Sequence, residues 1–176
     1  MAGAKGTSGQ PPCWSFRDRD VVNPSGEALL QEEQRVRRQG TGIEATELIG
    51  TWQLDQIWPK GQQRPAQFSA QVLRWLGAQL QISTAANQLQ LRNAVRLGLV
   101  ELRFEGPGSL QGRRPLLQFH FDQMQLWLAG RCVFSKPLPE PSPQKLPFFA
   151  LIQRDPSGWL AARDRGGGLA CWRLVA

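Results

Sequence analysis

The chain has 176 residues, 41% of them hydrophobic and 20% charged, and its formal net charge at pH 7 is +7. This composition is typical of one folded globular domain with an appendage, and it excludes a disordered or fibrous protein. No run of about 18 uninterrupted apolar residues occurs, so we expect no transmembrane segment.

The cysteines and the first residues bear on the cellular compartment. Cys13, Cys132 and Cys171 show neither CxxC nor CxH spacing. Neither a disulfide framework nor a zinc site is indicated, and we expect reduced thiols. Residues 1–13 lack the apolar core of a secretory signal, so the sequence predicts a cytoplasmic protein.

Residues 1–24 are rich in Gly, Pro, Ser and Asp, a composition that predicts a flexible N-terminal arm. The arm contains one apolar island around Trp14 and Phe16. This island could dock on a partner.

The next stretch predicts an amphipathic helix. Residues 27–39 carry acidic side chains early and basic ones late, as the helix dipole favours. Ser25 is suited to cap the start and Gly40 to end the helix. With a further helical turn over residues 43–48, the predicted helical segment covers residues 25–48.

Beyond residue 49 the sequence changes to short runs of period two, which indicate β-strands. Gly50-Thr51-Trp52 begins the first of them: the glycine lets the backbone bend, and the tryptophan has the size to plug one end of a small barrel. A short lid helix is predicted over residues 68–76, because Phe68 and Trp75 share one helical face. Further predicted strands cover residues 80–84, 88–96, 99–104, 116–121, 124–128, 132–135, 148–153, 159–163 and 169–175.

Turn signals separate several of these strands. Glu105-Gly106-Pro107-Gly108 and Asp155-Pro156-Ser157-Gly158 both have the composition of turns. Many short strands at close spacing predict a mainly β protein, with an antiparallel sheet closed into a barrel over residues 49–176.

The clearest alternation lies in residues 116–128, LLQFHFDQMQLWL. Leu117, Phe119 and Phe121 alternate with polar residues, and Met124, Leu126 and Leu128 then alternate with Gln123, Gln125 and Trp127. One face is therefore apolar enough to form a barrel interior. Small barrels are usually filled by their own side chains, so a packed core is the commoner outcome and a ligand cavity the alternative. The predicted cavity-lining residues are Trp52, Leu54, Phe68, Trp75, Leu117, Phe119, Phe121, Met124 and Leu126.

Gly50-Thr51-Trp52 resembles the G-x-W element with which lipocalin-like barrels open their first strand. In such folds a basic residue of the last strand packs over the tryptophan, and the resemblance gives this closing role to Arg173, together with Gly50 and Trp52. Residues 27–176 are also similar in layout to the plastid-lipid-associated proteins, or fibrillins, of photosynthetic organisms. The chain departs from that family's pattern by lacking tyrosine and by a proline-rich insert at residues 136–147. The residues that match in kind are Leu48, Gly50, Trp52, Leu54, Asp164, Arg165 and Gly167.

The sequence offers little catalytic chemistry. His120 is the single histidine, and the carboxylates after residue 49 are scattered without a pair at catalytic spacing. Gly166-Gly167-Gly168 lacks the Lys-Ser/Thr that follows in a phosphate-binding loop, so we read it as a hairpin turn. We expect no catalytic residue, no metal and no cofactor other than a bound lipid or pigment.

The positive charge is concentrated in the predicted barrel. Residues 49–176 carry fifteen Lys/Arg and seven Asp/Glu, whereas residues 1–48 carry six and seven. Such a surface favours an anionic membrane or an acidic protein complex, and without an RRM, KH or zinc pattern we expect no nucleic acid. Basic residues in the predicted loops would form one surface if the loops share a barrel end: Arg113, Arg114, Arg131, Lys136 and Lys145.

Three functions follow from these patterns. The first is a non-enzymatic carrier of an apolar or amphipathic molecule, such as a lipid, quinone, carotenoid or tetrapyrrole, located in the cytoplasm or peripheral to a thylakoid membrane. The second is an assembly factor that grips an acidic protein complex through basic loops and the N-terminal arm. The third, by resemblance to lipocalin-fold enzymes, is a bilin lyase.

Overall fold

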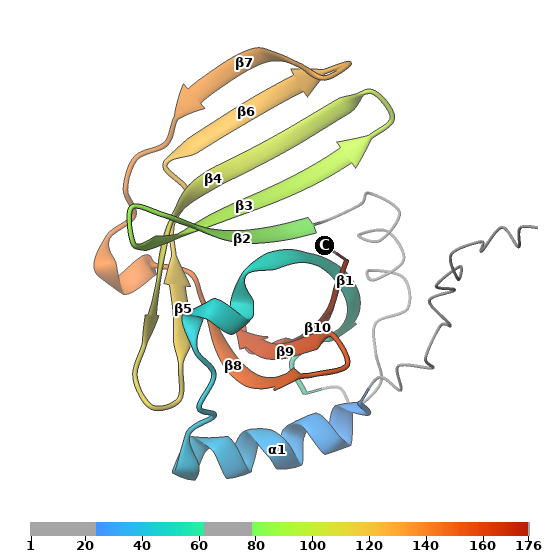
Figure 1. Cartoon of the computed structure of the whole chain (residues 1–176), viewed down its shortest axis with the longest axis vertical. Coiled ribbons are helices and arrows are strands. Elements are labelled where there is room, and N and C mark those ends of the chain that lie inside the picture. Colours follow the sequence, from blue (N-terminus) through green and yellow to red (C-terminus); the bar gives the residue numbers. More distant parts are fainter. Residues whose placement is uncertain (1–23, 62–78, 176) are drawn as a thin grey trace, which may run out of the picture.

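Ten antiparallel strands and one α-helix are the main elements of the computed structural model, which describes residues 24–61 and 79–175 (Figure 1). The helix is α1 (Gly26–Gln39), and a short 3-10 helix spans Ala45–Leu48. The strands are β1 (Gly50–Trp58), β2 (Gln79–Ala85), β3 (Gln88–Leu97), β4 (Val100–Gln111), β5 (Leu116–Phe119), β6 (Gln123–Leu128), β7 (Arg131–Pro137), β8 (Phe148–Asp155), β9 (Trp159–Asp164) and β10 (Leu169–Leu174).

Eight of these strands close into a barrel. Their order is β3-β2-β1-β10-β9-β8-β5-β4, and a further pairing of β4 with β3 completes the ring. The first and last strands of the chain are neighbours, with Trp52 opposite Leu174. The predicted antiparallel, lipocalin-like barrel with an N-terminal helix is therefore confirmed. The predicted arm (1–24) and lid helix (68–76) lie outside the described residues, except for Pro24.

A β-bulge in β1 gives this strand buried side chains on both faces. Trp52 and Leu54 point into the barrel, but the register shifts between Leu54 and Gln56. After a bulge the alternation is displaced by one residue. Ile57 consequently packs on the interior cluster, whereas Trp58 is buried in a second cluster on the outer wall together with Leu29 of α1.

Helix α1 covers part of the outer wall. Ser25 Oγ accepts a hydrogen bond from the N–H of Ala28 at 3.1 Å, and Gly40 ends the helix with φ of 82°. Its inward face buries Leu29 and Val36, and also Glu33, against the barrel. The predicted helix and both of its caps are thus present.

The predicted turn at residues 105–108 is wrong, because β4 continues through it to Gln111. The two glycines instead allow close approach: a Cβ on Gly106 would lie 2.1 Å from the His120 carbonyl oxygen, and one on Gly108 would lie 2.2 Å from Leu91 Cδ1. Pro107 lies where β4 changes partner, since β4 pairs with β6 up to Glu105 and with β5 from Gly108. A residue without an N–H is tolerated at such a break in the ladder.

Beyond this break the sheet leaves the barrel. Residues 93–105 of β3 and β4, together with β6 and β7, form a four-stranded extension that we call the wing. Figure 1 shows the wing above the barrel, on the side away from α1. The strand β7 is the last in the sheet order.

Candidate functional site

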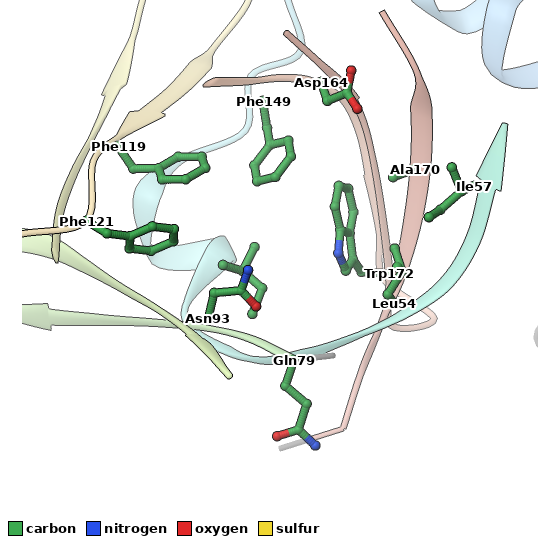
Figure 2. Close-up of a pocket in the computed structure, with 11 residues that line it drawn as sticks. Leu54, Ile57, Gln79, Asn93, Phe119, Phe121, Phe149, Asp164, Ala170 and Trp172 are labelled. Atoms are coloured by element: carbon green, nitrogen blue, oxygen red, sulfur yellow. The ribbon is translucent and has the colours of Figure 1, made fainter. Parts of the chain in front are cut away.

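The barrel contains a cavity of about 240 Å³ that is partly open to solvent. For comparison, an engineered apolar cavity of about 150 Å³ already admits benzene. The cavity can therefore hold a ring system or a segment of an acyl chain. Residues from seven strands and from the segment after β5 line it (Figure 2): Leu54, Ile57, Gln79, Leu80, Asn93, Phe119, Phe121, Phe149, Asp164, Ala170 and Trp172.

One side of the cavity is a continuous row of aromatic rings. The ring centroids of Phe121 and Phe119 are 5.4 Å apart, those of Phe119 and Phe149 are 5.3 Å apart, and Phe149 meets Trp172 edge-on at 5.1 Å. Figure 2 shows these side chains around one open space. Such a row offers a large apolar contact area to a planar or chain-like ligand.

Polar side chains enter this lining at three positions: Gln79, Asn93 and Asp164. Among the described residues that line the cavity, Asp164 is the only ionisable one. It ends β9, opposite Phe149 of β8. A carboxylate at the edge of an aromatic site favours a ligand that carries a cation or a hydrogen-bond donor at one end.

The three glycines after Asp164 hold this carboxylate in place. The N–H of Gly168 donates to Asp164 Oδ1 at 2.9 Å, and the N–H of Gly167 donates to the Asp164 carbonyl at 3.1 Å. A Cβ on Gly168 would lie 3.2 Å from Asp164 Oδ2, and Gly167 has φ of 90°. The segment is a hairpin turn, as the sequence predicts, and it fixes the direction of the acid.

The structure brings together part of the predicted cavity set. Leu54, Phe119 and Phe121 line the cavity, while Trp52 and Leu117 are buried in the same interior cluster without lining it. Phe68 and Trp75 lie outside the described residues.

Met124 and Leu126 were expected in the lining, and this prediction is wrong. Both belong to β6, which pairs with the part of β4 that lies in the wing. The apolar residues of this stretch change from odd to even positions between Phe121 and Met124, where the chain passes from β5 in the barrel to β6 in the wing. The pattern marks an apolar face on each strand without showing which part of the sheet the strand joins.

The predicted closure of the barrel is half right. Trp52 is fully buried, and its Nε1 donates to the Leu48 carbonyl at 2.8 Å. The guanidinium over its ring, however, is that of Arg154 from β8, at 4.9 Å. Arg173 is opposite Gln53 in the register and therefore on the other face of the sheet, where it lies 3.8 Å from Asp55.

The predicted basic surface is divided among three places. Arg114, beside Arg113 in the β4–β5 turn, is directed at Glu33 of α1, with 2.7 Å between the charged atoms. Arg131 and Lys136 lie on β7 in the wing, and Lys145 is in a short 3-10 helix, Pro143–Lys145. The five side chains do not form one cluster.

Several lining residues were missed by sequence reasoning. Ile57 was hidden by the bulge, and Gln79 and Asn93 are polar residues on strands that otherwise look amphipathic. Phe149, Ala170 and Trp172 belong to continuous apolar runs in β8 and β10, FFALI and LACW. These runs predict buried strands, but no period-two pattern in them shows which residues face the barrel interior.

The described part of the chain contains neither a metal-ligating cluster nor a helix able to span a membrane. It contains no group of three or more His, Cys, Asp and Glu side chains close enough to hold a metal ion. No helix within residues 24–61 and 79–175 has the length and apolar character needed to cross a membrane.

The barrel has the form of the lipocalin-like folds that the sequence resembles. The closer resemblance to the plastid-lipid-associated proteins has no support outside the sequence motif itself. No protein-family model matches this chain, and no curated protein shows significant similarity to it.

Proposed function

We propose that the protein binds an apolar or amphipathic small molecule inside its barrel and performs no chemistry on it. The observation that carries this proposal is the cavity of about 240 Å³ whose wall is a row of four aromatic side chains. Ligand sites of this type are concave and mostly apolar, with a few polar groups that fix orientation. A lipid, quinone, carotenoid or tetrapyrrole would place a ring or chain segment there.

The polar residues of the lining indicate how such a ligand is oriented. Asp164 lies at one edge, and Gln79, which is solvent-exposed, lies at another. The apolar part of the ligand would contact Phe119, Phe149 and Trp172, and a hydrogen-bond donor or cation would meet the carboxylate of Asp164. The cavity thus favours an amphipathic molecule with a positively charged or donor end over one with an anionic end.

A fluorescent apolar probe tests binding in the cavity. N-phenyl-1-naphthylamine should bind the protein with increased emission, and Ala170→Leu, which fills the cavity, should abolish this binding. The matched control is Ala94→Leu, because Ala94 neighbours Asn93 on β3 and faces away from the cavity. Equal binding by both variants, with thermal unfolding showing that both are folded, would place the probe elsewhere and contradict the proposal.

The role of Asp164 has a separate test. Decylamine should displace the probe at lower concentration than decanoate does, because the carboxylate attracts the cation and repels the anion. Asp164→Asn keeps the acceptor for the Gly168 N–H and should remove this difference. An unchanged preference in the variant would exclude Asp164 from the site.

A second candidate function is that of an assembly factor for an acidic protein complex, and one observation supports it. The proline-rich segment at residues 136–147 is held on the barrel although it supplies no buried core residue: Arg165 donates to the carbonyls of Leu146 at 3.1 Å and Gln144 at 2.6 Å. A fixed, exposed segment of this kind suits recognition by a protein. Deleting residues 1–24 separates the two functions, since a carrier keeps its ligand whereas an adaptor loses its acidic partner.

The bilin lyase is the third proposal. A bilin lyase must form a coloured complex with bilin. Failure of the purified protein to form such a complex would exclude this function. Location at a thylakoid membrane also stays a prediction from the sequence resemblance.

A further inference from the structure

Two hairpin turns at the far end of the wing lie side by side and carry apolar side chains. Residues 97–100 join β3 to β4 and residues 128–131 join β6 to β7, and the Ala129 N–H donates to the Leu99 carbonyl at 2.8 Å. We call these two turns the wing tip; Figure 1 shows them together, far from α1. Four large apolar side chains are exposed there: Leu97 by 54%, Leu99 by 73%, Val100 by 43% and Leu128 by 48%.

These residues contribute nothing to the barrel core. Hairpin turns normally consist of Gly, Asn, Asp and other polar residues, because turns face water. Apolar side chains that gather on a surface indicate an interaction site. The wing tip is therefore a candidate interaction surface.

The apolar surface continues from the wing tip down one face of the wing. The register aligns Val100 with Leu128, Leu102 with Leu126 and Phe104 with Met124 on the same face. Asn93, which lines the cavity, is opposite Phe104 in the β3–β4 pairing. The ring centroid of Phe104 is 5.7 Å from that of Phe121, the first ring of the aromatic row. An apolar path thus connects the wing tip with the cavity.

The opposite face of the wing is polar and internally paired. Arg96 lies 2.6 Å from Glu101, which also pairs with Arg103, and Arg103 stacks 3.9 Å above the ring of Trp127. The wing is therefore an amphipathic sheet with one apolar and one ion-paired face.

The charge of the wing favours an anionic partner. Residues 93–105 and 123–137 carry four basic and two acidic side chains. Both acids are neutralised in ion pairs, Glu101 as above and Glu105 with Arg92 at 2.5 Å. Arg131 and Lys136 are exposed on β7 and make no ion pair with any residue of the described ranges. Arg131 is opposite Leu128 at the wing tip, and Lys136 is opposite Met124 at the other end of β7. A basic side chain beside exposed apolar ones, as at the tip, matches an anionic headgroup layer over hydrocarbon.

We propose that the wing tip inserts into the headgroup region of an anionic lipid bilayer, and that the apolar face of the wing guides the ligand between the bilayer and the cavity. The guiding step rests on the proposed carrier function. A bilayer suits two narrow turns better than a protein partner does, because lipids adapt to a projecting tip whereas a protein needs a matched surface of larger area.

Co-sedimentation with vesicles tests the docking. Vesicles of phosphatidylcholine with phosphatidylglycerol should bind the protein, and phosphatidylcholine alone should bind it much more weakly. The double variant Leu99→Gln, Leu128→Gln should bind the anionic vesicles at least about tenfold more weakly, since two apolar side chains no longer insert. Arg131→Gln should weaken binding about fivefold, and only where phosphatidylglycerol is present. Lys136→Gln should weaken it less, because Lys136 lies at the other end of β7, opposite Met124.

The matched control is Ile49→Gln, Val175→Gln. These two apolar side chains have comparable exposure, 43% and 48%, but lie outside the wing. The control should bind vesicles like the unchanged protein. Equal loss in both double variants, or no binding of anionic vesicles at all, would overturn the docking proposal.

The remaining outcomes separate the two proposals. Ala170→Leu should lose N-phenyl-1-naphthylamine and keep vesicle binding, whereas the wing-tip variant should do the reverse. If probe binding fails in the unchanged protein while vesicle binding still depends on the tip, the docking stands and the guiding step falls with the proposed function. If light scattering shows a dimer that the wing-tip variant converts to a monomer, a second copy covers the tip and the bilayer proposal is overturned.

Discussion

Glu33 of α1 forms ion pairs with the barrel. We predict that its substitution destabilises the protein more than any other single substitution in the helix. Its carboxylate is 3% exposed and lies 2.7 Å from Arg114 of the β4–β5 turn and 2.5 Å from Arg163 of β9. Arg37, one helical turn further on, approaches to 3.1 Å. A buried acid contacted by three guanidinium groups is strongly held in its charged form.

The pKa of Glu33 gives the magnitude. Burial alone would raise the pKa of this carboxyl, but the hydrogen bonds from Arg163 and Arg37 outweigh burial and lower it from 4.5 to about 2. Each pKa unit corresponds to about 1.4 kcal/mol, so the charged form contributes on the order of 3 kcal/mol to stability. Because the folded pKa is below the unfolded one, this contribution is present above pH 4.5 and is lost as the pH falls toward 2.

Urea unfolding of Glu33→Gln at several pH values is the assay. At pH 7 we expect a loss of about 3 to 5 kcal/mol, since the substitution leaves buried arginines without their acid. Below pH 5 the loss should shrink, because the acid of the unchanged protein is then protonated during unfolding. Glu32→Gln is the control: its partner Arg35 is on the solvent side of α1, and an exposed pair of this kind contributes about 0 to 1 kcal/mol. The proposed role of Glu33 would be refuted if both variants lost the same free energy of unfolding. It would also be refuted if the loss in Glu33→Gln did not change with pH.

Three further predictions follow from other contacts. Arg154→Gln should destabilise the protein by about 0.5 to 2 kcal/mol, because a cation–π contact with Trp52 is lost. Arg173→Gln should destabilise it less. A larger loss of thermal stability in Arg173→Gln than in Arg154→Gln would make Arg173 the residue that closes the barrel. Burial raises the pKa of the Cys171 thiol to about 12, so this thiol should be unreactive at pH 8. In the Cys13→Ser variant a disulfide reagent at pH 8 should modify only the exposed Cys132 in the folded protein, and Cys171 should react only after denaturation. Gly106→Ala should cost about 1 to 3 kcal/mol, because its Cβ would meet the backbone of residues 120–122, and it should cost more than Gly108→Ala, which meets a flexible leucine; equal melting temperatures would contradict this reading of the strand.

Helix caps and tight turns could be predicted from the sequence, because each depends on a few neighbouring residues. The cap at Ser25 and the end of α1 at Gly40 both depend on neighbouring residues alone. The same holds for the turn after β8, where the Gly158 N–H donates to the Asp155 carbonyl at 3.0 Å and the Ser157 N–H to the Asp155 side chain at 2.8 Å. Such signals are complete within a few residues, so no tertiary information is needed to recognise them.

Partners across the sheet could not be predicted in this way. The sequence around Pro107 has turn composition, yet β3 and β4 pair on both sides of it, and the glycines serve contacts with residues 91 and 120–122. The sequence resemblance placed Arg173 over Trp52, whereas Arg154 occupies that position, for a related reason. Which face a residue occupies depends on the register with the neighbouring strand, and the two bulges in β1 and β8 change that face after the bulge.

The barrel has two walls of different character. Consecutive side chains of one strand pack on opposite faces of the first wall: in β8 Leu151 packs inside and Ile152 outside, and in β1 Ile57 packs inside and Trp58 outside. In β9 and β10 four consecutive residues each are buried, so the wall beside α1 is packed on both faces.

The wall made by β3 and β4 is packed on its inner face alone, because Arg92 and Arg96 on its outer face are exposed. Few buried contacts make a region of a protein easier to open locally. Phe149, Asp164 and Trp172 belong to the doubly packed wall, so the groups that contact the ligand are held rigidly. Opening is then concentrated on the side of Asn93, where the apolar face of the wing meets the cavity. Hydrogen exchange should then be slow in β9 and β10 and faster in β3. Addition of anionic vesicles should change the exchange of β3 and of the wing tip but not that of β9 and β10; equal exchange in the two walls would contradict entry of the ligand from the wing.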